Sequence, residues 1–412
     1  MRIDGISLKI IPDSRGEDTL SAIFNSGDIS VSADVPSGKS RGSHEAFVLD
    51  PEEAVAKFES IKAKIISVST RIENQKAFDD FLIALDGTPD KSNIGGNLIL
   101  ALSLAWARLK AKSGNRELYE YIRSIYNRPV AAGHFPLPIM NVINGGAHSS
   151  NKLDFQEFQI IPQAFTFEKA AKLREKYGAE NISLGDEAGF SAPFENNEET
   201  LDLLSFLIKE NNSVLRLGLD MAASRYFRKN QNENIKNQNY YLLNKKEYSA
   251  DELREYYLKL AKKYKFISLE DPFDEESFDD FAAFTARINA DNISINQQYQ
   301  HESASEVLII ADDLTTTNPE RLKTAIEKKA GNAILVKPNQ VGTLSETIGV
   351  CRMAADAGWK TVVSHRSGET EDDFIADLAY GVGAWGMKAG APATQYRLAK
   401  YERLLKIASL AS

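Results

Sequence analysis

The stretch from Leu215 to Gly390 most strongly constrains the fold, because short apolar runs within it repeatedly end on a charged side chain. In chain order these side chains are Asp220, Glu270, Asp312, Lys337, His365 with Arg366, and Lys388. The stretch between each of these side chains and the next is long enough for a helix that returns the chain to a neighbouring parallel strand. A charge at one strand end ordinarily marks where a buried strand meets water. Six in succession predict the catalytic face of a (β/α) barrel.

The residues before this stretch predict a small separate domain. Residues 5–35 alternate between apolar and polar and carry turn signals, which is typical of an antiparallel meander of three strands. Helical periodicity follows at about 51–67, 74–85, 97–113 and 116–123. We therefore expect an α/β protein with a small α+β domain over residues 1–130 and a barrel over residues 131–412.

The barrel region contains one more strand candidate than an eight-stranded barrel needs. Apolar runs at 139–143 and 155–161, and a short run that closes on Gly185, raise the candidates to nine. We predict that the segment before Lys388 is an accessory strand outside the eight-stranded barrel. We also predict a helix near 167–177, a solvated loop at 230–239 and a polar insertion at 289–305.

The composition excludes several classes of protein. The single cysteine, Cys351, rules out a disulfide framework and a cysteine-based zinc site. No apolar run approaches the ~18 residues that span a bilayer, and the first residues lack a signal-peptide core, so we expect a cytoplasmic protein with no membrane partner. A net charge of −9 argues against nucleic acid as a partner. An anionic substrate would need positive charge supplied within the site.

The three acidic strand ends point to a metal. Asp220, Glu270 and Asp312 would repel one another if they converged without a cation. Sites built only from oxygen ligands and rich in carboxylates suit hard divalent cations, and Mg²⁺ is the usual occupant in enzymes. The alternative is a solvated acidic rim, which becomes less credible when three acids stand at matching strand ends.

The basic strand ends point to acid–base chemistry on an anion. A lysine such as Lys337, beside a divalent cation and other positive groups, has its pKa lowered and can act as a base. The planar fork of Arg366 suits a phosphate or a carboxylate. Together with Lys388, these residues fit the removal of a proton next to a carboxylate, with the enediolate held on Mg²⁺.

Longer motifs make a family resemblance specific. The chain resembles the enolase family of phosphopyruvate hydratases, for which a lysine base with Mg²⁺ ions is already known chemistry. The segments that carry the resemblance in the barrel region are Asn144–His148, Gly185–Glu187, Ser268–Phe273, Ala311–Thr315, Leu335–Glu346 and Ser364–Asp372. Outside it they are Asp13–Gly16, Val35–Gly38 and Asn93–Asn97. The resemblance spans nearly the whole chain and implies an enolase-type (β/α)8 TIM-like barrel.

The resemblance implies a hydro-lyase that reversibly converts 2-phospho-D-glycerate into phosphoenolpyruvate in glycolysis and gluconeogenesis. It implies two Mg²⁺ ions per site, the first held by the three strand-end acids and the second, which depends on substrate, joined by Ser40. Lys337 would take the α-proton. Glu187 would be the general acid for the β-hydroxyl, kept protonated by neighbouring carboxylates such as Glu157.

The resemblance also implies a set of substrate-binding residues. Arg366 and Ser367 match the phosphate contacts, and Lys388 would neutralise the carboxylate side of the intermediate. The full set is His148, Gln156, Glu157, His365, Arg366, Ser367 and Lys388.

The chain departs from the family pattern at several positions. Residues 38–42 read Gly-Lys-Ser-Arg-Gly where the family usually has Gly-Ala-Ser-Thr-Gly, which adds two cations beside Ser40. Ala188 and Ala389 replace a usual glycine and threonine, and the interval from His148 to Glu187 is short by roughly one helix. The family's homodimer is also implied, although the expected interface residues differ.

Two other readings compete with this one. The chain could be another superfamily member that dehydrates an acid sugar, or an enolase-like protein that binds partners without catalysis. The intact Glu187 and the Arg366-Ser367 pair argue against the first. Three converging carboxylates, for which a scaffold has no physical need, argue against the second.

Overall fold

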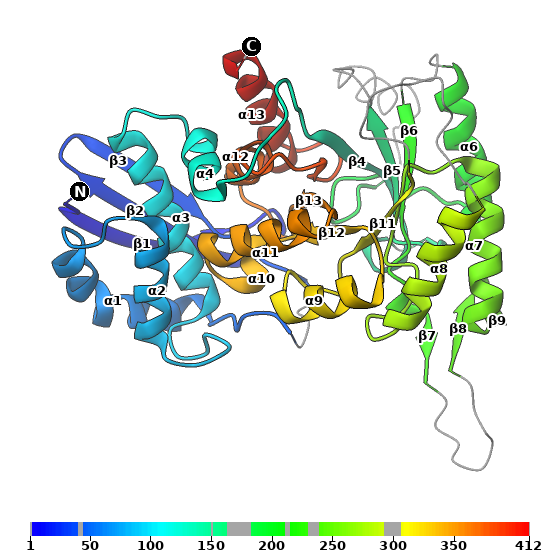
Figure 1. Cartoon of the computed structure of the whole chain (residues 1–412), viewed down its shortest axis with the longest axis horizontal. Coiled ribbons are helices and arrows are strands. Elements are labelled where there is room, and N and C mark those ends of the chain that lie inside the picture. The colour runs from blue at the N-terminus through cyan, green and yellow to red at the C-terminus, as the bar shows by residue number, and fades with distance from the viewer. Residues whose placement is uncertain are drawn as a thin grey trace.

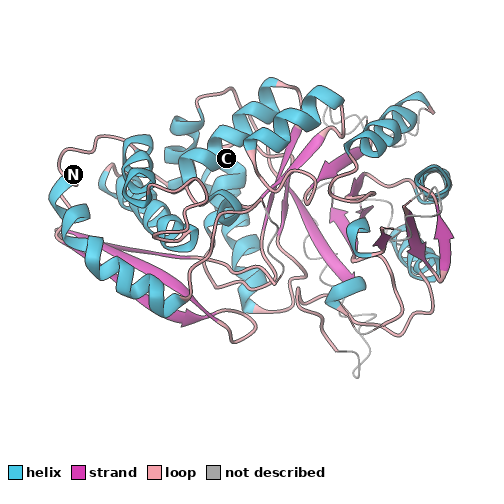
Figure 2. Cartoon of the chain, turned by 90° about the horizontal axis from the view of Figure 1, so that it is seen from below, coloured by secondary structure: helices cyan, strands magenta, loops and turns pink. Residues whose placement is uncertain are grey.

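The computed structural model describes residues 2–39, 44–149, 151–162, 183–210, 215–229, 239–291 and 306–411. A small N-terminal domain of sheet and helices precedes a closed barrel of eight strands (Figure 1). Figure 2 shows the N-terminal sheet and the barrel strands as separate groups, with helices around them. The predicted architecture of a meander domain followed by a barrel is confirmed.

The N-terminal domain follows the sequence pattern closely. Its antiparallel sheet has the order β1 (Gly5–Pro12), β2 (Asp18–Ser26), β3 (Ile29–Asp34). Its helices are α1 (Pro51–Val68), α2 (Gln75–Asp86), α3 (Gly96–Ser113) and α4 (Leu118–Tyr126). Asp50 caps α1 by accepting from the Glu52 amide, and Asn74 caps α2. Gly87 ends α2 in the left-handed conformation, with φ of 75°.

The barrel closes in the order β10-β11-β12-β13-β14-β4-β5-β6. The strands are β4 (Leu137–Asn144), β5 (Glu157–Pro162), β6 (Leu215–Asp220), β10 (Ser268–Glu270), β11 (Leu308–Ala311), β12 (Ala333–Val336), β13 (Lys360–Ser364) and β14 (Gly386–Lys388). Neighbouring strands are parallel except at β5, which runs antiparallel to both β4 and β6. The polar residues at the carboxyl ends of the parallel strands therefore meet at one mouth.

The predicted accessory position of the last strand is wrong. The segment before Lys388 is β14, which pairs with β13 and with β4 and so closes the barrel. The surplus candidate is the run that closes on Gly185. There Leu184 makes only an isolated bridge to Phe190, which in turn bridges Ile143 of β4. Short apolar runs of three or four residues do not reveal their partners in the sequence, which explains the error.

Helices connect and cover the barrel strands. They are α6 (Asn197–Glu210), α7 (Ala250–Tyr264), α8 (Phe278–Ala290), α9 (Pro319–Lys328), α10 (Pro338–Val341), α11 (Leu344–Asp356), α12 (Phe374–Gly381) and α13 (Gln395–Ala411). A three-stranded antiparallel sheet, β7 (Phe227–Arg228), β8 (Tyr240–Leu243) and β9 (Lys246–Tyr248), lies beside them. The predicted helix at 167–177 lies outside the described residues, as do nearly all of the predicted loop at 230–239 and most of the predicted insertion at 289–305. No helix within the described ranges is both long and apolar enough to cross a membrane.

Two cores support the site. The larger one runs through both domains, where α11 packs against α2, α3 and α4 (Figure 1). A smaller apolar cluster comes from the barrel strands and the residues beside them: Ile139, Ile161, Ile267, Leu308, Ile310, Ala333, Leu335, Val362 and Trp385. Because alternate strand residues face inward, this cluster fills the barrel interior below the mouth.

Candidate active site

The barrel mouth holds a cavity of about 370 Å³. Its lining includes eleven of the thirteen predicted site residues: His148, Gln156, Glu157, Glu187, Asp220, Asp312, Lys337, His365, Arg366, Ser367 and Lys388. Glu270 is buried at the end of β10, directly beside Asp220 in the strand register, and so belongs to the same mouth. Ser40 lies outside the described residues.

Lysines neutralise the three strand-end acids. The Lys388 Nζ atom lies 2.8 Å from Glu270 Oε1, 3.0 Å from Glu157 Oε2 and 3.2 Å from Asp220 Oδ2. Lys337 Nζ lies 2.5 Å from Asp312 Oδ2. These side chains are nearly or fully buried, so each charge depends on its partner.

The acids have oxygens suited to a hard cation. Asp312 Oδ1 is buried and has no hydrogen-bond partner among the described residues, although a buried carboxylate oxygen normally has one. Asp271, Asp312 and Asp313 each place an oxygen within 4.8 Å of the others. Asp271 also accepts from the backbone amides of Asp312 and Asp313, at 3.0 and 2.8 Å. These three carboxylates, of which only Asp312 is a predicted ligand, form a donor set of the kind that Mg²⁺ prefers.

The expectation of a lowered pKa for Lys337 applies to a lysine beside a divalent cation and stays a prediction. Burial lowers the pKa, and the nearby Arg366 acts in the same direction. The carboxylates of Asp312 and Asp313 act in the opposite direction, and the pKa of Lys337 lies above its ordinary value. Lys337 therefore carries its proton while it is paired with Asp312.

A buried pair of carboxyl groups occupies another part of the cavity. Burial raises the pKa of Glu157 well above its usual range, and the charge of Glu187 raises it further. Burial acts to raise the pKa of Glu187, whereas its contacts with His365 and His148 and its hydrogen bond with Glu157 act to lower it, and the pKa lies well below its usual range. The resting proton is therefore on Glu157. This corrects the expectation that Glu157 keeps Glu187 protonated.

Hydrogen bonds orient this carboxyl pair. Asn141 Nδ2 donates to Glu187 Oε2 at 3.2 Å, and Gln159 Nε2 donates to Glu157 Oε2 at 3.0 Å. His148 Nδ1 lies 3.8 Å from Glu187 Oε1, and His365 Nε2 lies 3.5 Å from Glu187 Oε2. Burial lowers the pKa of both histidines, that of His365 to about 4. Both imidazoles are therefore neutral near pH 7.

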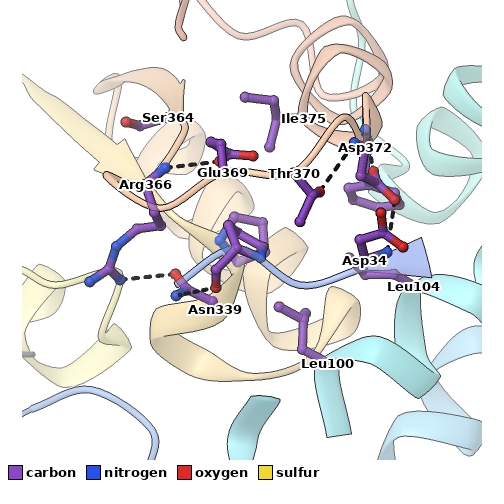
Figure 3. Close-up of a pocket in the computed structure, with 13 residues that line it drawn as sticks. Asp34, Leu100, Leu104, Asn339, Ser364, Arg366, Glu369, Thr370, Asp372 and Ile375 are labelled. Atoms are coloured by element: carbon purple, nitrogen blue, oxygen red, sulfur yellow. Dashed lines mark hydrogen bonds between the residues drawn. The ribbon is translucent and has the colours of Figure 1, made fainter. Parts of the chain in front are cut away.

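The Arg366 side chain is held from both domains. Its Nη1 atom donates to Glu45 Oε2 at 3.0 Å and to Asn339 Oδ1 at 2.9 Å. Its backbone amide donates to Glu369 Oε1 at 3.0 Å, and Figure 3 shows the contacts with Asn339 and Glu369. A Cβ atom added to Gly38 would lie 2.0 Å from Arg366 Nη2, so only glycine permits this approach. The guanidinium is thus fixed before any substrate binds.

Residues 37–39, at the start of the substituted loop, join the two walls of the mouth. Ser37 and Gly368 form an antiparallel bridge, and the Lys39 amide donates to Ser367 Oγ at 2.8 Å. The Lys39 Nζ atom then lies 2.8 Å from Asp186 Oδ2, one residue before Glu187. One of the two cations that depart from the family pattern therefore contacts the turn that carries Glu187.

Gln156 lies beside the predicted metal ligands. Its Nε2 atom donates to Asp220 Oδ2 at 3.4 Å, and its Oε1 atom accepts from Arg225 Nε at 2.9 Å. Gln156 therefore faces the acidic side of the cavity, as expected from its position just before β5.

Sequence reasoning missed several residues that shape the site. Asn141 and Gln159 are inward-facing strand residues, and the alternation of their strands is a signal that could have found them. Glu45 lies in a loop of small and polar residues, where nothing distinguishes it from a solvated acid. Arg397 falls on the apolar side of a helix far from any motif.

Comparison with known proteins agrees with the geometry. The family model described as "Enolase, N-terminal domain" matches residues 3–122, and "Enolase, C-terminal TIM barrel domain" matches residues 132–411. The chain is 38% identical to "Enolase B" of Dictyostelium discoideum, over 99% of this chain and 94% of that protein. It is 39% identical to "Enolase" of Sulfurisphaera tokodaii, over 98% and 95%. It is 38% identical to "Enolase" of Methanocaldococcus jannaschii, over 98% and 94%. The full-length matches, together with the strand-end acids and bases, show that the chain belongs to the enolase family.

Proposed function

We propose that the barrel mouth performs the enolase reaction with the residues described above. The chain is a hydro-lyase that dehydrates 2-phosphoglycerate to phosphoenolpyruvate. The observation that carries the assignment of residues is that one cavity contains Lys337, the Glu157–Glu187 carboxyl pair and the strand-end carboxylates. A dehydration of this kind needs a base for one proton and an acid for the departing hydroxyl.

Enolases use Mg²⁺, and Asp220, Glu270 and Asp312 are the residues we assign to hold it. When bound, Mg²⁺ stabilises the negative charge that develops on the substrate carboxylate. If Asp312 held the ion, Lys337 would lose the carboxylate partner that keeps it protonated, and its amine would be free to take a proton. A second Mg²⁺, joined by Ser40, stays a prediction.

Lys337 is the base in this proposal. Its amine takes the proton from the carbon next to the substrate carboxylate, and the electron pair left behind delocalises into that carboxylate as an enediolate. Lys388, which already bonds Glu157, Asp220 and Glu270, supplies positive charge on the same side.

Glu187 is the group that delivers the second proton. The proton rests on Glu157 and passes to Glu187 through their shared hydrogen bond. Glu187 then gives it to the β-hydroxyl, the carbon–oxygen bond breaks, and water leaves as the double bond of phosphoenolpyruvate forms. The net change is the loss of one water from the substrate.

The other predicted residues bind and orient the substrate. Arg366 and Ser367 Oγ contact the phosphate, for which the fixed guanidinium is suited. His148, His365 and Gln156 line the same cavity and position the reacting carbons.

The experiment is the growth of the phosphoenolpyruvate enol absorbance after addition of 2-phosphoglycerate, with Mg²⁺ or with excess chelator. The protein is expected to give signal only with Mg²⁺. Lys337→Ala should lose turnover, while Lys360→Ala, an exposed lysine at the start of β13, should keep it. Circular dichroism checks that both variants fold. A near-normal rate for Lys337→Ala would remove that lysine from its role.

Three broader assignments remain part of the proposal. The boundary between the domains falls near residue 130, the protein acts in the cytoplasm, and it forms a homodimer whose interface differs from the family pattern. A light-scattering mass in solution tests the last of these. The relatives named enolase favour 2-phosphoglycerate over an acid sugar, and the absorbance assay tests that choice directly.

A further inference from the structure

Arg397 is a fully buried cation at the base of the active site. It extends from α13 and contacts two segments that carry proposed catalytic and binding groups. Its Nη1 atom donates to the carbonyl of Arg366 at 2.7 Å. Its Nη2 atom donates to the carbonyls of Ser367 at 2.6 Å and Asp186 at 3.1 Å. One guanidinium therefore ties the phosphate-binding segment to the turn that carries Glu187.

The charge of Arg397 is compensated in an unusual way. Among the described residues, no carboxylate lies within ion-pair distance of its guanidinium, which is instead surrounded by carbonyl oxygens. A buried charge without an ionic partner costs several kcal/mol. The guanidinium offsets that cost by donating to three carbonyl oxygens that a neutral, apolar side chain would leave unpaired.

The remaining contact of Arg397 is with the imidazole of His365. The Nη1 atom of Arg397 is in hydrogen-bond contact with Nδ1 of His365. An arginine can only donate, so Nδ1 must be the acceptor and carries no proton. The proton of the neutral imidazole is then on Nε2, the atom 3.5 Å from Glu187 Oε2. The hydrogen-bond chain therefore determines the tautomer of His365.

We propose that Arg397 is a positioning residue that fixes His365 in its Nε2–H tautomer and so keeps a neutral hydrogen-bond donor facing Glu187. This inference rests on the proposed role of Glu187. With Nδ1 occupied by a cation, His365 does not take up a second proton, so it does not compete for the proton of the carboxyl pair. The Nε2–H group stabilises the Glu187 carboxylate both before it receives the proton from Glu157 and after it delivers it.

Gly390 supports this arrangement from the segment just after β14. It has φ of 76°, and a Cβ atom there would lie 2.7 Å from the Glu187 carbonyl and 3.2 Å from both Arg397 Cδ and His365 Cε1. The Ala391 amide also donates to the Glu187 carbonyl at 3.0 Å. The absence of a side chain at this position allows Arg397, His365 and Glu187 to approach one another.

The tautomer can be observed directly in the unmodified protein. The chain has five histidines, so a protein labelled with ¹⁵N-histidine gives five imidazole patterns in two-bond ¹H–¹⁵N correlation spectra. The pattern missing from His365→Gln identifies His365. We expect the Nε2–H form at pH 7. An Nδ1–H form or a doubly protonated imidazolium would overturn the proposal, whatever the activity of the enzyme.

Substitution then tests whether Arg397 imposes the tautomer. Arg397→Met should give a mixture of His365 tautomers and lower kcat roughly tenfold or more, by a larger factor than KM rises. The matched control is Lys400→Met, because Lys400 is equally buried, lies one turn later in α13 and bonds Glu369 and the Thr370 carbonyl rather than His365. The control should keep the Nε2–H pattern. An unchanged tautomer in Arg397→Met, or a changed tautomer in Lys400→Met, contradicts the proposal.

Discussion

At the scale of single residues, the two proton transfers are assigned to separate side chains in one cavity. Lys337 is paired with Asp312, whereas Glu187 is surrounded by Glu157, Asn141 and the two histidines. Loss of Glu187 should therefore block the second proton transfer and leave the first one intact.

We expect Glu187→Gln to separate the two steps. The variant keeps a hydrogen-bonding side chain but cannot deliver a proton to the hydroxyl, so kcat should fall by roughly a hundredfold or more. Removal of the α-proton by Lys337 should persist. In deuterated water, NMR should show deuterium entering carbon 2 of 2-phosphoglycerate without dehydration.

Lys337→Ala is the comparison for this exchange experiment, and it should lose both exchange and dehydration. If Glu187→Gln also lost the exchange, Glu187 would be needed for the first proton transfer, contrary to its role as the acid of the second.

Much of the residue-level site was predictable from the sequence. Asp220, Glu270, Asp312, Lys337 and Lys388 each end an apolar run, and parallel strand ends must converge. The contacts made by Arg397 were not predictable, because a basic residue on a helix reveals neither its burial nor its partners. The position of the proton within the Glu157–Glu187 pair was not predictable either, because it depends on donors from three other segments.

At the scale of elements, the direction of β5 was the main unpredicted feature. Its apolar alternation was visible, but alternation is the same in either direction. The accessory strand was misassigned for a related reason. Strand β14 has only three residues, and the run before Gly185 looks similar in the sequence. The meander and helices of the first domain were predictable because turn and cap residues mark their ends.

Strand β6 contains a glycine that the barrel interior requires. A Cβ atom at Gly218 would lie 2.6 Å from Gln159 Oε1, 2.7 Å from Ser268 Oγ and 2.9 Å from Ile161 Cδ1. We expect Gly218→Ala to lower the free energy of unfolding by about 1–3 kcal/mol, because the neighbours must move. Urea denaturation followed by circular dichroism measures this.

Gly349 is the control for that substitution. It lies inside α11, and a Cβ atom added there would have no neighbouring atom within 4 Å. Gly349→Ala should therefore raise the free energy of unfolding by about 0.5–1 kcal/mol, because alanine loses less conformational entropy in a helix. If both substitutions stabilised the protein, the barrel interior at Gly218 would have to be loosely packed.

At the scale of the whole molecule, a buried polar network joins the two domains. Asp79 of α2 accepts from Gln75 Nε2 at 3.0 Å and Ser103 Oγ at 2.7 Å. It also accepts from the Ser345 amide of α11 at 2.9 Å. Burial raises the pKa of Asp79 to about 6. The packing of the domains is thus linked to the protonation of one carboxyl group.

The raised pKa predicts how stability changes with pH. Between about pH 4 and pH 6 the folded protein binds more protons at Asp79 than the unfolded chain, so the free energy of unfolding falls as pH rises through this window. The shift from 3.8 to about 6 corresponds to a loss of about 3 kcal/mol, which is complete about one pH unit above the folded-state pKa. Asp79→Asn has no such proton to lose.

The test is the stability of Asp79→Asn minus that of the unsubstituted protein, measured by urea denaturation from pH 4 to pH 8. The hydrogen bonds lost in Asp79→Asn shift the difference curve by the same amount at every pH. The rise of the curve between pH 4 and pH 6 reports the proton bound by Asp79. A flat difference curve would contradict the raised pKa.

The reversed strand β5 has a consequence for isotope exchange. Its inward-facing residues run from Glu157 at the mouth, through Gln159, to Ile161 in the apolar cluster that fills the barrel. Within the part of the chain that the structure describes, this cluster offers water no polar route from below, so we expect the carboxyl pair to exchange hydrogen with solvent through the mouth. A bound substrate would occupy that opening. The proton held by the pair should therefore keep its isotopic label for the lifetime of the complex, and the label should be released only when product departs.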